Sequence, residues 1–403
     1  MSEDLNKRKK ATQAVWAGEE SYLMESVTQV PVVHSVSFGY QDVDEWKQVA
    51  LGQKKGHIYG RNTNPTVEVF EEKIRQLEGG EAATSFSTGM AAISNTLFTL
   101  LKPGDRCVSV HDTYGGTNKI FIEFFPKFGI DVSLCDTTDF DRIEAEIAAG
   151  CQLLYMESPT NPTCKIMDIE RLAKKAHEAG AIVVVDNTFA TPINQNPLEL
   201  GADLVIHSAT KYLGGHADAL GGAVVGAADK IEEIYHFREI NGATLHPEAA
   251  YLILRGMKTL ALRIERQNAN AMKVADFLND HPFVSEVFYP GLPQHKNHDV
   301  AARQMRGFGG MLSFKLKSED FEAVRRFLPK LKYAHRAANL GAVETIVAPP
   351  ATGSHVELTV EERAAAGIPE TLVRYSAGIE DGDDLIDDLK QALAETEACL
   401  QSV

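Results

Sequence analysis

The stretch DIERLAKKAHEAGAIVVVD, residues 168–186, decides the fold class. Asp168 is a typical helix N-cap, and Gly180 is a typical helix end. Between them, apolar side chains recur on one helical face, at Ile169, Leu172, Ala173 and Ala176. The apolar run AIVVV follows at once and ends at Asp186. A helix that passes directly into a short apolar strand predicts βαβ units and a parallel sheet.

The same alternation of helical and strand patterns extends from about residue 65 to residue 226. Further strands are expected at residues 106–110, 130–135, 152–156 and 203–206. Right-handed crossovers between such strands place helices on both faces of a mostly parallel sheet. The predicted fold class is therefore α/β.

The pattern changes after Pro247. We expect one long helix over residues 248–281, followed by a smaller domain with a strand at 309–317 and helices at 321–328 and from Asp383 onward. The first 60 residues show little periodicity and are expected to form an arm that packs on another subunit. The predicted division is an arm, residues 1–62, a large domain, residues 63–255, and a small C-terminal domain, residues 256–403.

Composition and charge limit the possible partners. The chain has 403 residues, of which 44% are hydrophobic and 24% charged, as in ordinary globular proteins. Its formal net charge of -16 argues against nucleic acid, and its apolar runs are too short for a membrane span or a secretory signal. The five scattered cysteines predict free thiols in a reducing compartment. We expect a cytoplasmic protein with neither a membrane nor a nucleic acid as its partner.

Two polar residues at expected strand ends are the first candidates for chemistry. Asp186 ends the run AIVVV, and Lys211 follows the run ADLVI within HSATKYLGG, residues 207–215. Each has an ordinary alternative, a turn cap for Asp186 and a solvated charge for Lys211. On neighbouring strand ends they would instead suit pyridoxal phosphate, the lysine forming a Schiff base and the carboxylate pairing with the pyridinium nitrogen.

A third candidate is the stretch SFSTGMAA, which leads into a helical pattern. The backbone N–H groups of Gly89 and Met90 would point from a helix N-terminus towards an anion. Alone, this pattern indicates only a well-capped helix. Together with the hydroxyl groups of Ser208 and Thr210 beside Lys211, it predicts a site for the cofactor's phosphate group.

Several long motifs resemble one known family. They are HIYGRNTNPT, STGMAA, DTYGGT, MESPTNPT, VVDNTFATP, HSATKYLGGH, LRGMKTL, YPGLPQH and LVRYSAGIED. The chain is similar over these motifs to the Cys/Met-metabolism family of pyridoxal 5'-phosphate enzymes, which includes cystathionine γ-synthases, cystathionine lyases, methionine γ-lyases and homoserine-ester sulfhydrylases. The resemblance implies the aspartate-aminotransferase-like fold of fold type I and a homotetramer built from two dimers.

The resemblance also implies roles for individual residues. It makes Lys211 the Schiff-base lysine, Asp186 the pyridinium partner and Asn161 the partner of the phenolic oxygen. It makes Tyr114 the residue that stacks on the ring and acts as acid or base at the γ-leaving group. The resemblance implies that the phosphate group contacts Gly89, Met90, Ser208 and Thr210. It implies that the substrate contacts Arg374, Asn339 and Tyr59. Tyr59 and Arg61 are also implied to contact the phosphate group bound to the neighbouring subunit.

The implied reaction is γ-elimination on a γ-substituted L-amino acid, through an external aldimine and a β,γ-unsaturated intermediate. Methionine, homocysteine and cystathionine are possible substrates, as is an O- or N-linked analogue such as canavanine. The alternative is a γ-replacement synthase of the cystathionine γ-synthase or O-acyl-homoserine sulfhydrylase type. β-Elimination ranks third, and a catalytically silent binding scaffold ranks last because no cofactor position is lost.

The chain departs from the family pattern around the expected substrate pocket. Gly116 stands where methionine γ-lyases commonly have cysteine, and Gly60 stands where serine is usual between Tyr59 and Arg61. Cystathionine lyases usually have an acidic residue just before the motif SLGG. In this chain the stretch is AANLGAVET, with Ala338 at the acidic position and Asn339 in place of the serine. In TGSH, which replaces SMTH, the changed residues are Thr352, Gly353 and Ser354, whereas His355 is kept. These departures favour a γ-substituent unlike that of methionine or cystathionine.

Overall fold

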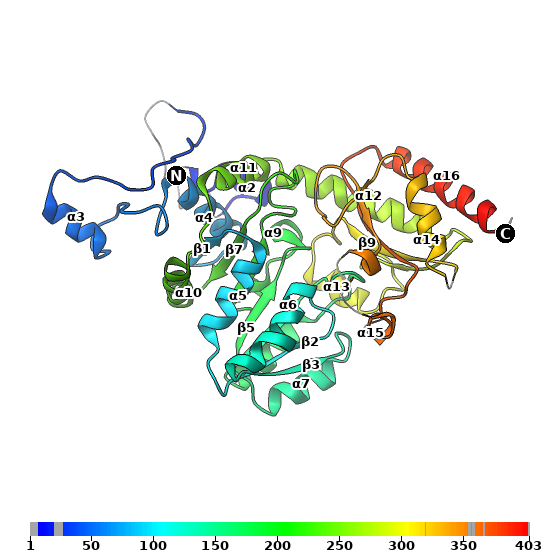
Figure 1. Ribbon diagram of the computed structural model, residues 1–403, viewed down its shortest axis with the longest axis horizontal. Coiled ribbons are helices and arrows are strands. Elements are labelled where there is room, and N and C mark those ends of the chain that lie inside the picture. Colours follow the sequence, from blue (N-terminus) through cyan, green and yellow to red (C-terminus); the bar gives the residue numbers. More distant parts are fainter. Residues whose placement is uncertain are drawn as a thin grey trace.

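The computed structural model describes residues 7–19, 27–318, 320–353, 356, 359–365 and 367–401. Two β-sheets organise this part of the chain, a larger one within residues 82–226 and a smaller one within residues 284–376. Figure 1 shows the larger sheet at the centre, the smaller one with its helices on the right, and an N-terminal segment that projects on the left. The division at residues 62 and 255 remains a prediction.

The larger sheet has seven strands in the order β1-β7-β6-β5-β4-β2-β3. Strands β6, β5, β4, β2 and β3 are parallel, whereas β7 is antiparallel to both of its neighbours. The expected strands are present to within a few residues, and β1 and β7 are additional. The seven are β1 (Ala82–Phe86), β2 (Arg106–Val110), β3 (Asp131–Cys135), β4 (Leu153–Glu157), β5 (Ile182–Asp186), β6 (Leu204–Ser208) and β7 (Gly222–Gly226).

Helices cover both faces of this sheet. On one face Val184 packs with apolar residues of α5 and α10, and on the other Val183 and Val185 pack with those of α7 and α8. Since all three valines are fully buried, each contributes about 1.5–3 kcal/mol of hydrophobic stabilisation. The helices of this region are α4 (Pro65–Glu78), α5 (Gly89–Leu100), α6 (Gly115–Lys119), α7 (Phe140–Ala148), α8 (Ile169–Glu178), α9 (Thr191–Asn194) and α10 (Ala228–Asn241).

The local prediction for residues 168–186 is confirmed. The Asp168 side chain accepts a hydrogen bond from the backbone N–H of Arg171 and caps α8. The backbone of Gly180 has a φ of 75°, a conformation that favours glycine and ends the helix before β5. The order of helix, glycine and buried strand in the sequence therefore gave the correct βαβ unit.

The smaller sheet has the order β10-β11-β12-β9-β8. Its core is shared with α12, α14 and α16, whose apolar residues pack against β9 and β12. The elements are β8 (Val284–Phe288), β9 (Met311–Leu316), β10 (His335–Arg336), β11 (Ile346–Ala348), β12 (Leu372–Ser376), α12 (Leu260–Asn279), α13 (His298–Gln304), α14 (Glu322–Phe327), α15 (Val360–Ala365) and α16 (Gly382–Gln401). Among the described residues, no helix has the length and apolar character needed to span a membrane.

The expectation of one helix over residues 248–281 is wrong. The segment forms two helices, α11 (Pro247–Met257) and α12. The Gly256 carbonyl accepts hydrogen bonds from the Thr259 backbone N–H, the Thr259 hydroxyl and the Arg263 guanidinium. These donors replace the next helical N–H, so the helix breaks at this carbonyl.

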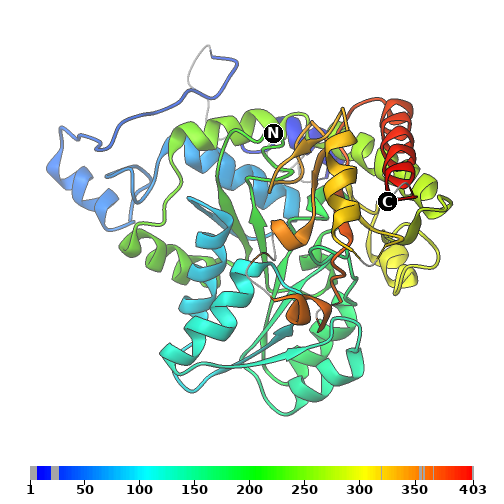
Figure 2. The ribbon, with the colours of Figure 1, turned by 45° about the vertical axis from the view of Figure 1, so that its right-hand side comes forward.

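The first 60 residues contain more regular structure than expected. Helix α2 (Lys10–Trp16) packs on α4, where the buried ammonium group of Lys73 donates to the carbonyls of Ala14 and Val15. Helix α3 (Val43–Ala50) is capped by the Asp42 side chain and lies on the segment that projects from the body in Figures 1 and 2. Helix α3 has only 8 residues, a length at which an apolar pattern does not distinguish a helix from an irregular segment, so sequence analysis missed it.

Candidate active site

Asp186 and Lys211 lie at the carboxyl ends of two neighbouring parallel strands. Asp186 is the last residue of β5 and pairs in register with Ile206 of β6. Lys211 follows three residues after the end of β6, in a turn closed by a hydrogen bond from its N–H to the Ser208 carbonyl. In open α/β sheets, ligands bind in the crevice outside such strand ends. The turn continues through Gly215, where a Cβ atom would lie 2.1 Å from the Arg263 guanidinium.

The Lys211 side chain is largely withdrawn from solvent. Burial, assisted by the positive charge of Arg374, lowers the pKa of Lys211 to about 8. Its Nζ donates a hydrogen bond to the side-chain oxygen of Asn339 at 2.7 Å. A lysine with this pKa has an appreciable neutral fraction near pH 7, and the neutral amine is the form that attacks a carbonyl carbon.

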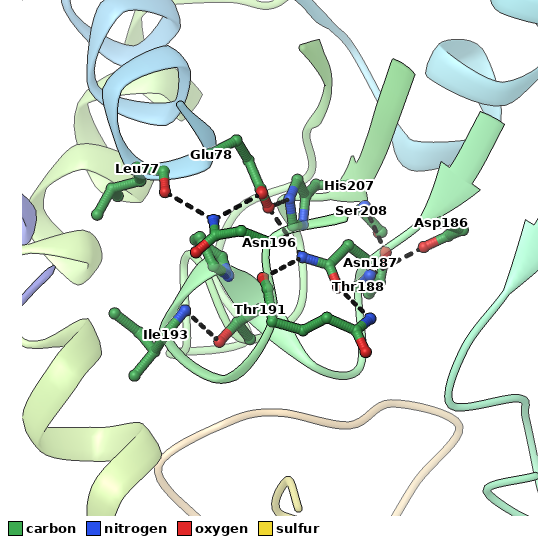
Figure 3. A network of polar contacts seen from close by, with 12 residues as sticks. Leu77, Glu78, Asp186, Asn187, Thr188, Thr191, Ile193, Asn196, His207 and Ser208 are labelled. Atoms are coloured by element: carbon green, nitrogen blue, oxygen red, sulfur yellow. Dashed lines mark hydrogen bonds and ion pairs between the residues drawn. The ribbon is translucent and has the colours of Figure 1, made fainter. Parts of the chain in front are cut away.

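Asp186 is 7% exposed, and its carboxylate lies at the end of β5. Its Oδ1 accepts a hydrogen bond from the Thr188 backbone N–H at 2.9 Å, and the Thr188 hydroxyl accepts one from the Ser208 backbone N–H. Figure 3 shows this link between the ends of β5 and β6. Burial raises the pKa of Asp186, so a cationic partner would stabilise its ionised form.

The predicted phosphate residues meet where α5 begins. Thr88 caps α5 through a hydrogen bond from the Ala91 N–H to its hydroxyl, and the first N–H groups of an α-helix have no acceptor within the helix. A Cβ atom on Gly89 would lie 2.7 Å from the Ser208 Cβ, so only glycine allows this approach of α5 to β6. The Thr210 hydroxyl hydrogen-bonds with the backbone of Gly221. The free N–H groups at the start of α5 and the close approach of Gly89 to Ser208 are suited to binding a phosphate group.

Arg374 reaches this region from the smaller sheet. It lies in β12, is 6% exposed, and donates to the side-chain oxygen of Asn161 and to the backbone carbonyl of Asn339, each at 3.1 Å. Both acceptors are neutral, and burial lowers the pKa of Arg374. A buried guanidinium held by neutral oxygens is a suitable partner for a substrate carboxylate.

Tyr114 stands at the start of α6 and is 43% exposed. Its backbone N–H donates to the buried Glu157 carboxylate at 2.8 Å. A Cβ atom on Gly116 would lie 2.7 Å from the Met90 sulfur and 3.0 Å from the Tyr114 ring. Gly116 therefore lets the Met90 side chain and the Tyr114 ring approach each other. The importance of Glu157 was missed by sequence analysis, although its position at the end of β4 matches that of Asp186 in β5.

Tyr59 and Arg61 lie on the N-terminal arm. The Arg61 guanidinium stacks over the Tyr59 ring at 5.2 Å, and Tyr59 pairs with Ser37 in a short β-bridge. Both the side-chain contact between Arg61 and Tyr59 and the backbone bridge to Ser37 therefore lie within the arm. The arm is tied to the body at Asn62, whose carbonyl accepts a hydrogen bond from Arg238.

The structure describes only some of the remaining positions at which the chain differs from the family pattern around the expected substrate pocket. Ala338 precedes Asn339 in an irregular segment that crosses to Lys211. Gly353 follows the short helix Pro350–Thr352, and a Cβ atom there would lie 3.4 Å from the Pro349 carbonyl. Ser354 and His355 lie outside the described residues.

A buried polar network supports the strand ends from behind. Glu78 and His207 are both fully buried, and Nε2 of His207 lies 2.6 Å from the Glu78 carboxylate (Figure 3). The same carboxylate accepts from the side chains of Asn187, the neighbour of Asp186, and Asn196. Among the described residues, Nδ1 of His207 has no hydrogen-bond partner, so Nε2 is the ring nitrogen that donates to the Glu78 carboxylate. The network holds β5 and β6 together next to the ends of these strands, at Asp186 and Ser208.

Comparisons with known proteins agree with this geometry. The family model for the "Cys/Met metabolism PLP-dependent enzyme" matches residues 11–394. L-methionine gamma-lyase of Fusobacterium nucleatum subsp. polymorphum is 43% identical over 385 residues, which are 95% of this chain and 97% of that protein. Cystathionine gamma-lyase of Bacillus subtilis is 44% identical over 360 residues, 89% of this chain and 94% of that protein.

A solved structure extends the similarity to the fold. Cystathionine gamma synthase of Xanthomonas oryzae pv. oryzae, in complex with aminoacrylate and cysteine, has a TM-score of 0.91 and 39% identity. The alignment covers 97% of this chain and 99% of that one. Strand-end residues suited to a Schiff base, a family match over most of the chain and a shared fold of type I lead to one conclusion: the protein belongs to the Cys/Met metabolism family of enzymes that depend on pyridoxal 5'-phosphate.

Proposed function

We propose that the protein is a γ-lyase that acts on a γ-substituted L-amino acid. The observation that carries this proposal is the position of Lys211, a partly buried amine with a pKa of about 8, within hydrogen-bonding distance of Asn339. It lies beyond β6, beside the strand that ends in Asp186. An amine at this location suits both attachment of the cofactor and later proton transfer to and from the substrate.

The proposed cofactor residues come from four segments. Lys211 holds the aldehyde carbon, and Asp186 pairs with the pyridinium nitrogen. Asn161 donates to the phenolic oxygen, for which its amide nitrogen is suited because its oxygen already accepts from Arg374. The residues proposed for the phosphate are Gly89, Met90, Ser208 and Thr210. Pyridoxal phosphate supplies an electron sink when it is bound.

Substrate binding and proton transfer involve a second set of residues. Arg374 binds the substrate α-carboxylate and thereby fixes the direction of the Cα–H bond. The Lys211 amine, once free, takes the Cα proton, and Asn339 orients this amine through the hydrogen bond to its Nζ. Tyr114, half exposed at the start of α6, transfers a proton at the γ-leaving group. Loss of that group followed by hydrolysis gives a 2-oxo acid and ammonia.

The γ-substituent defines the substrate class. Methionine, homocysteine and cystathionine carry sulfur at this position, whereas canavanine carries oxygen joined to nitrogen. The differences from the family pattern at Gly116, Ala338 and Asn339 support a substrate whose γ-substituent is joined through oxygen or nitrogen. The related methionine and cystathionine gamma-lyases support elimination as the reaction.

γ-Replacement is the second candidate. It is favoured by one specific observation, the TM-score of 0.91 with a cystathionine gamma synthase. In that case, the same residues would activate the γ-position, and an incoming nucleophile would replace the leaving group. The two reactions differ in whether water or another nucleophile completes the turnover.

We also propose a homotetramer in which Tyr59 and Arg61 bind the phosphate group of a neighbouring subunit. The arm that carries them projects from the body (Figure 2), and Val43, Trp46 and Leu51 on this arm are exposed. Large apolar side chains on a projecting segment favour contact with another protein surface. A location in the cytoplasm remains a prediction.

The test is a single-turnover absorbance experiment with a panel of amino acids, combined with an assay for 2-oxobutanoate. The panel contains methionine, homocysteine, cystathionine, O-acyl homoserines and canavanine, and Lys211→Ala is the inactive control. A γ-lyase produces 2-oxobutanoate from one panel member without an added nucleophile. Product that forms only after addition of a thiol or another nucleophile would establish γ-replacement and refute the lyase.

A further inference from the structure

Glu157 connects two segments of the candidate active site. It is the last residue of β4 and is 4% exposed. Its Oε2 accepts a hydrogen bond from the Tyr114 backbone N–H at 2.8 Å, and its Oε1 accepts one from the Asn161 backbone N–H at 3.1 Å. One carboxylate thus holds the start of α6 and the turn after β4 at the same time.

Glu157 also lies beside Asp186. The two residues are paired in register at the ends of the parallel strands β4 and β5. Burial and the negative charge of Asp186 both raise the pKa of Glu157, so an ionised carboxylate is costly here. The two N–H donors lower the pKa again, but only in part, so they reduce this cost without removing it. An apolar residue would fill the space without such a cost, but it would leave both N–H groups without this acceptor.

We propose that Glu157 is a positioning residue that holds Tyr114 and Asn161 in place for the bound cofactor and the reacting substrate. This inference rests on the roles proposed above for Tyr114 and Asn161, but it does not depend on which amino acid is the substrate. Within the part of the chain that the structure describes, the Glu157 carboxylate binds only the backbone N–H groups of Tyr114 and Asn161, so it acts through them.

The chemistry of a carboxylate explains the choice of residue. Both of its oxygens accept hydrogen bonds, so it can serve two backbone donors. Glutamine has the same shape but only one acceptor oxygen, and its NH2 group would face one of the two N–H groups. That N–H would have to move away, and a displacement of about 1 Å in a catalytic group can lower the rate about 100-fold.

The first test compares Glu157→Gln with a matched control, Asp388→Asn. Asp388 is also buried and accepts hydrogen bonds from two backbone N–H groups, those of Lys332 and Tyr333, next to the smaller sheet. Pyridoxal 5'-phosphate is titrated into each apo-protein, and the dissociation constant and the melting temperature are measured. We expect about tenfold weaker cofactor binding for Glu157→Gln only, whereas both variants melt at a lower temperature. Equal cofactor binding by the two variants would overturn the proposal.

A second test asks whether Glu157 acts through Tyr114. Glu157→Gln should lower kcat about 100-fold in the wild-type background and much less in the Tyr114→Phe background, because the hydroxyl group that it positions is then absent. A full 100-fold loss in both backgrounds would contradict the proposal. Should Glu157→Gln not fold, Glu157→Asp, which keeps both acceptors on a shorter side chain, is measured instead. Unchanged cofactor affinity and kcat in that variant would also count against a positioning role.

The outcomes separate this inference from the proposed function. The titration with pyridoxal 5'-phosphate needs no substrate, so it decides the role of Glu157 in cofactor binding even if no amino acid in the panel is cleaved. If 2-oxobutanoate forms but Glu157→Gln binds the cofactor and turns over like the wild type, only the positioning role fails.

Discussion

Lys211 and Asn339 are joined by a hydrogen bond of 2.7 Å from the lysine Nζ to the asparagine side-chain oxygen, although 128 positions separate them in the chain. Lys211 follows a strand of the larger sheet, whereas Asn339 lies in a segment between β10 and β11 of the smaller sheet. The backbone carbonyl of Asn339 also accepts a hydrogen bond from Arg374. Asn339 therefore contacts both the proposed Schiff-base lysine and the proposed carboxylate-binding arginine.

Replacement of Asn339 by alanine is expected to lower kcat about fivefold, because loss of one orienting hydrogen bond costs about 1 kcal/mol. The backbone carbonyl that accepts from Arg374 remains, so KM should change little. Steady-state kinetics with the best substrate of the panel measures both constants. A large rise in KM with an unchanged kcat would instead show that Asn339 binds the substrate and does not orient the lysine.

Attachment of pyridoxal phosphate to the apo-protein is expected to accelerate as the pH rises through about 8. Burial and the nearby Arg374 lower the pKa of Lys211 to about 8, and only the neutral amine attacks the aldehyde. The rate should level off above this pH. Stopped-flow absorbance between pH 6 and pH 10 measures it, and an increase that continues to pH 10 would show that the lysine has its ordinary pKa.

The lowered pKa of Lys211 also makes the stability of the apo-protein depend on pH. The unfolded chain binds a proton at Lys211 up to its ordinary pKa of about 10.4, whereas the folded apo-protein releases it near pH 8. Between these values, the unfolded state binds more protons, so this lysine makes the free energy of unfolding rise with pH. Lys211→Met should remove that part of the pH dependence in urea unfolding at fixed protein concentration.

Replacement of Arg374 by lysine is expected to lower kcat/KM about 10- to 150-fold. A lysine keeps the charge but cannot form the paired hydrogen bonds of a guanidinium with a carboxylate, which contribute about 1.5–3 kcal/mol. The control is the corresponding amine without the α-carboxylate, for which the two proteins should react at similar rates. An equal loss with that amine would mean that Arg374 acts through the fold of the site.

Replacement of His207 by alanine is expected to lower the free energy of unfolding by about 3 kcal/mol, because the buried Glu78 carboxylate loses a donor. His177→Ala is a matched control, since His177 faces Asp203 at 3.0 Å on the surface. That variant should lose less than about 1 kcal/mol. Urea unfolding of both holoenzymes at one protein concentration makes the comparison, and equal losses would refute a special role for the buried pair.

Two inactive variants are expected to restore activity when they are combined in one oligomer. In a dimer of one Arg61→Ala chain and one Lys211→Ala chain, one of the two sites has both residues intact if Arg61 serves the neighbouring subunit. Co-expression with two affinity tags yields this hybrid. A hybrid without activity above that of the separate variants would contradict a shared site.

The sequence predicted the elements around the strand ends well because their signals are local. Asp168, Gly180 and the valines before Asp186 specify a capped helix, its end and a buried strand within 19 residues. Sequence analysis failed where a distant contact decides the structure. The helix expected over residues 248–281 breaks because Thr259 and the Arg263 guanidinium bind the Gly256 carbonyl, and no periodicity records that arrangement.

The sequence by itself determined the fold class and the dependence on pyridoxal phosphate, and it singled out Lys211 and Asp186 as candidates for the cofactor site, since these follow from local patterns and a family resemblance over most of the chain. Only the tertiary structure decided which side chains meet: Lys211 with Asn339, Arg374 with Asn161, and Glu157 with the backbone of Tyr114. The physical reason is that a local pattern fixes the conformation of a segment. The hydrogen bonds between segments depend on how the two sheets and the turns beyond their strands pack in space.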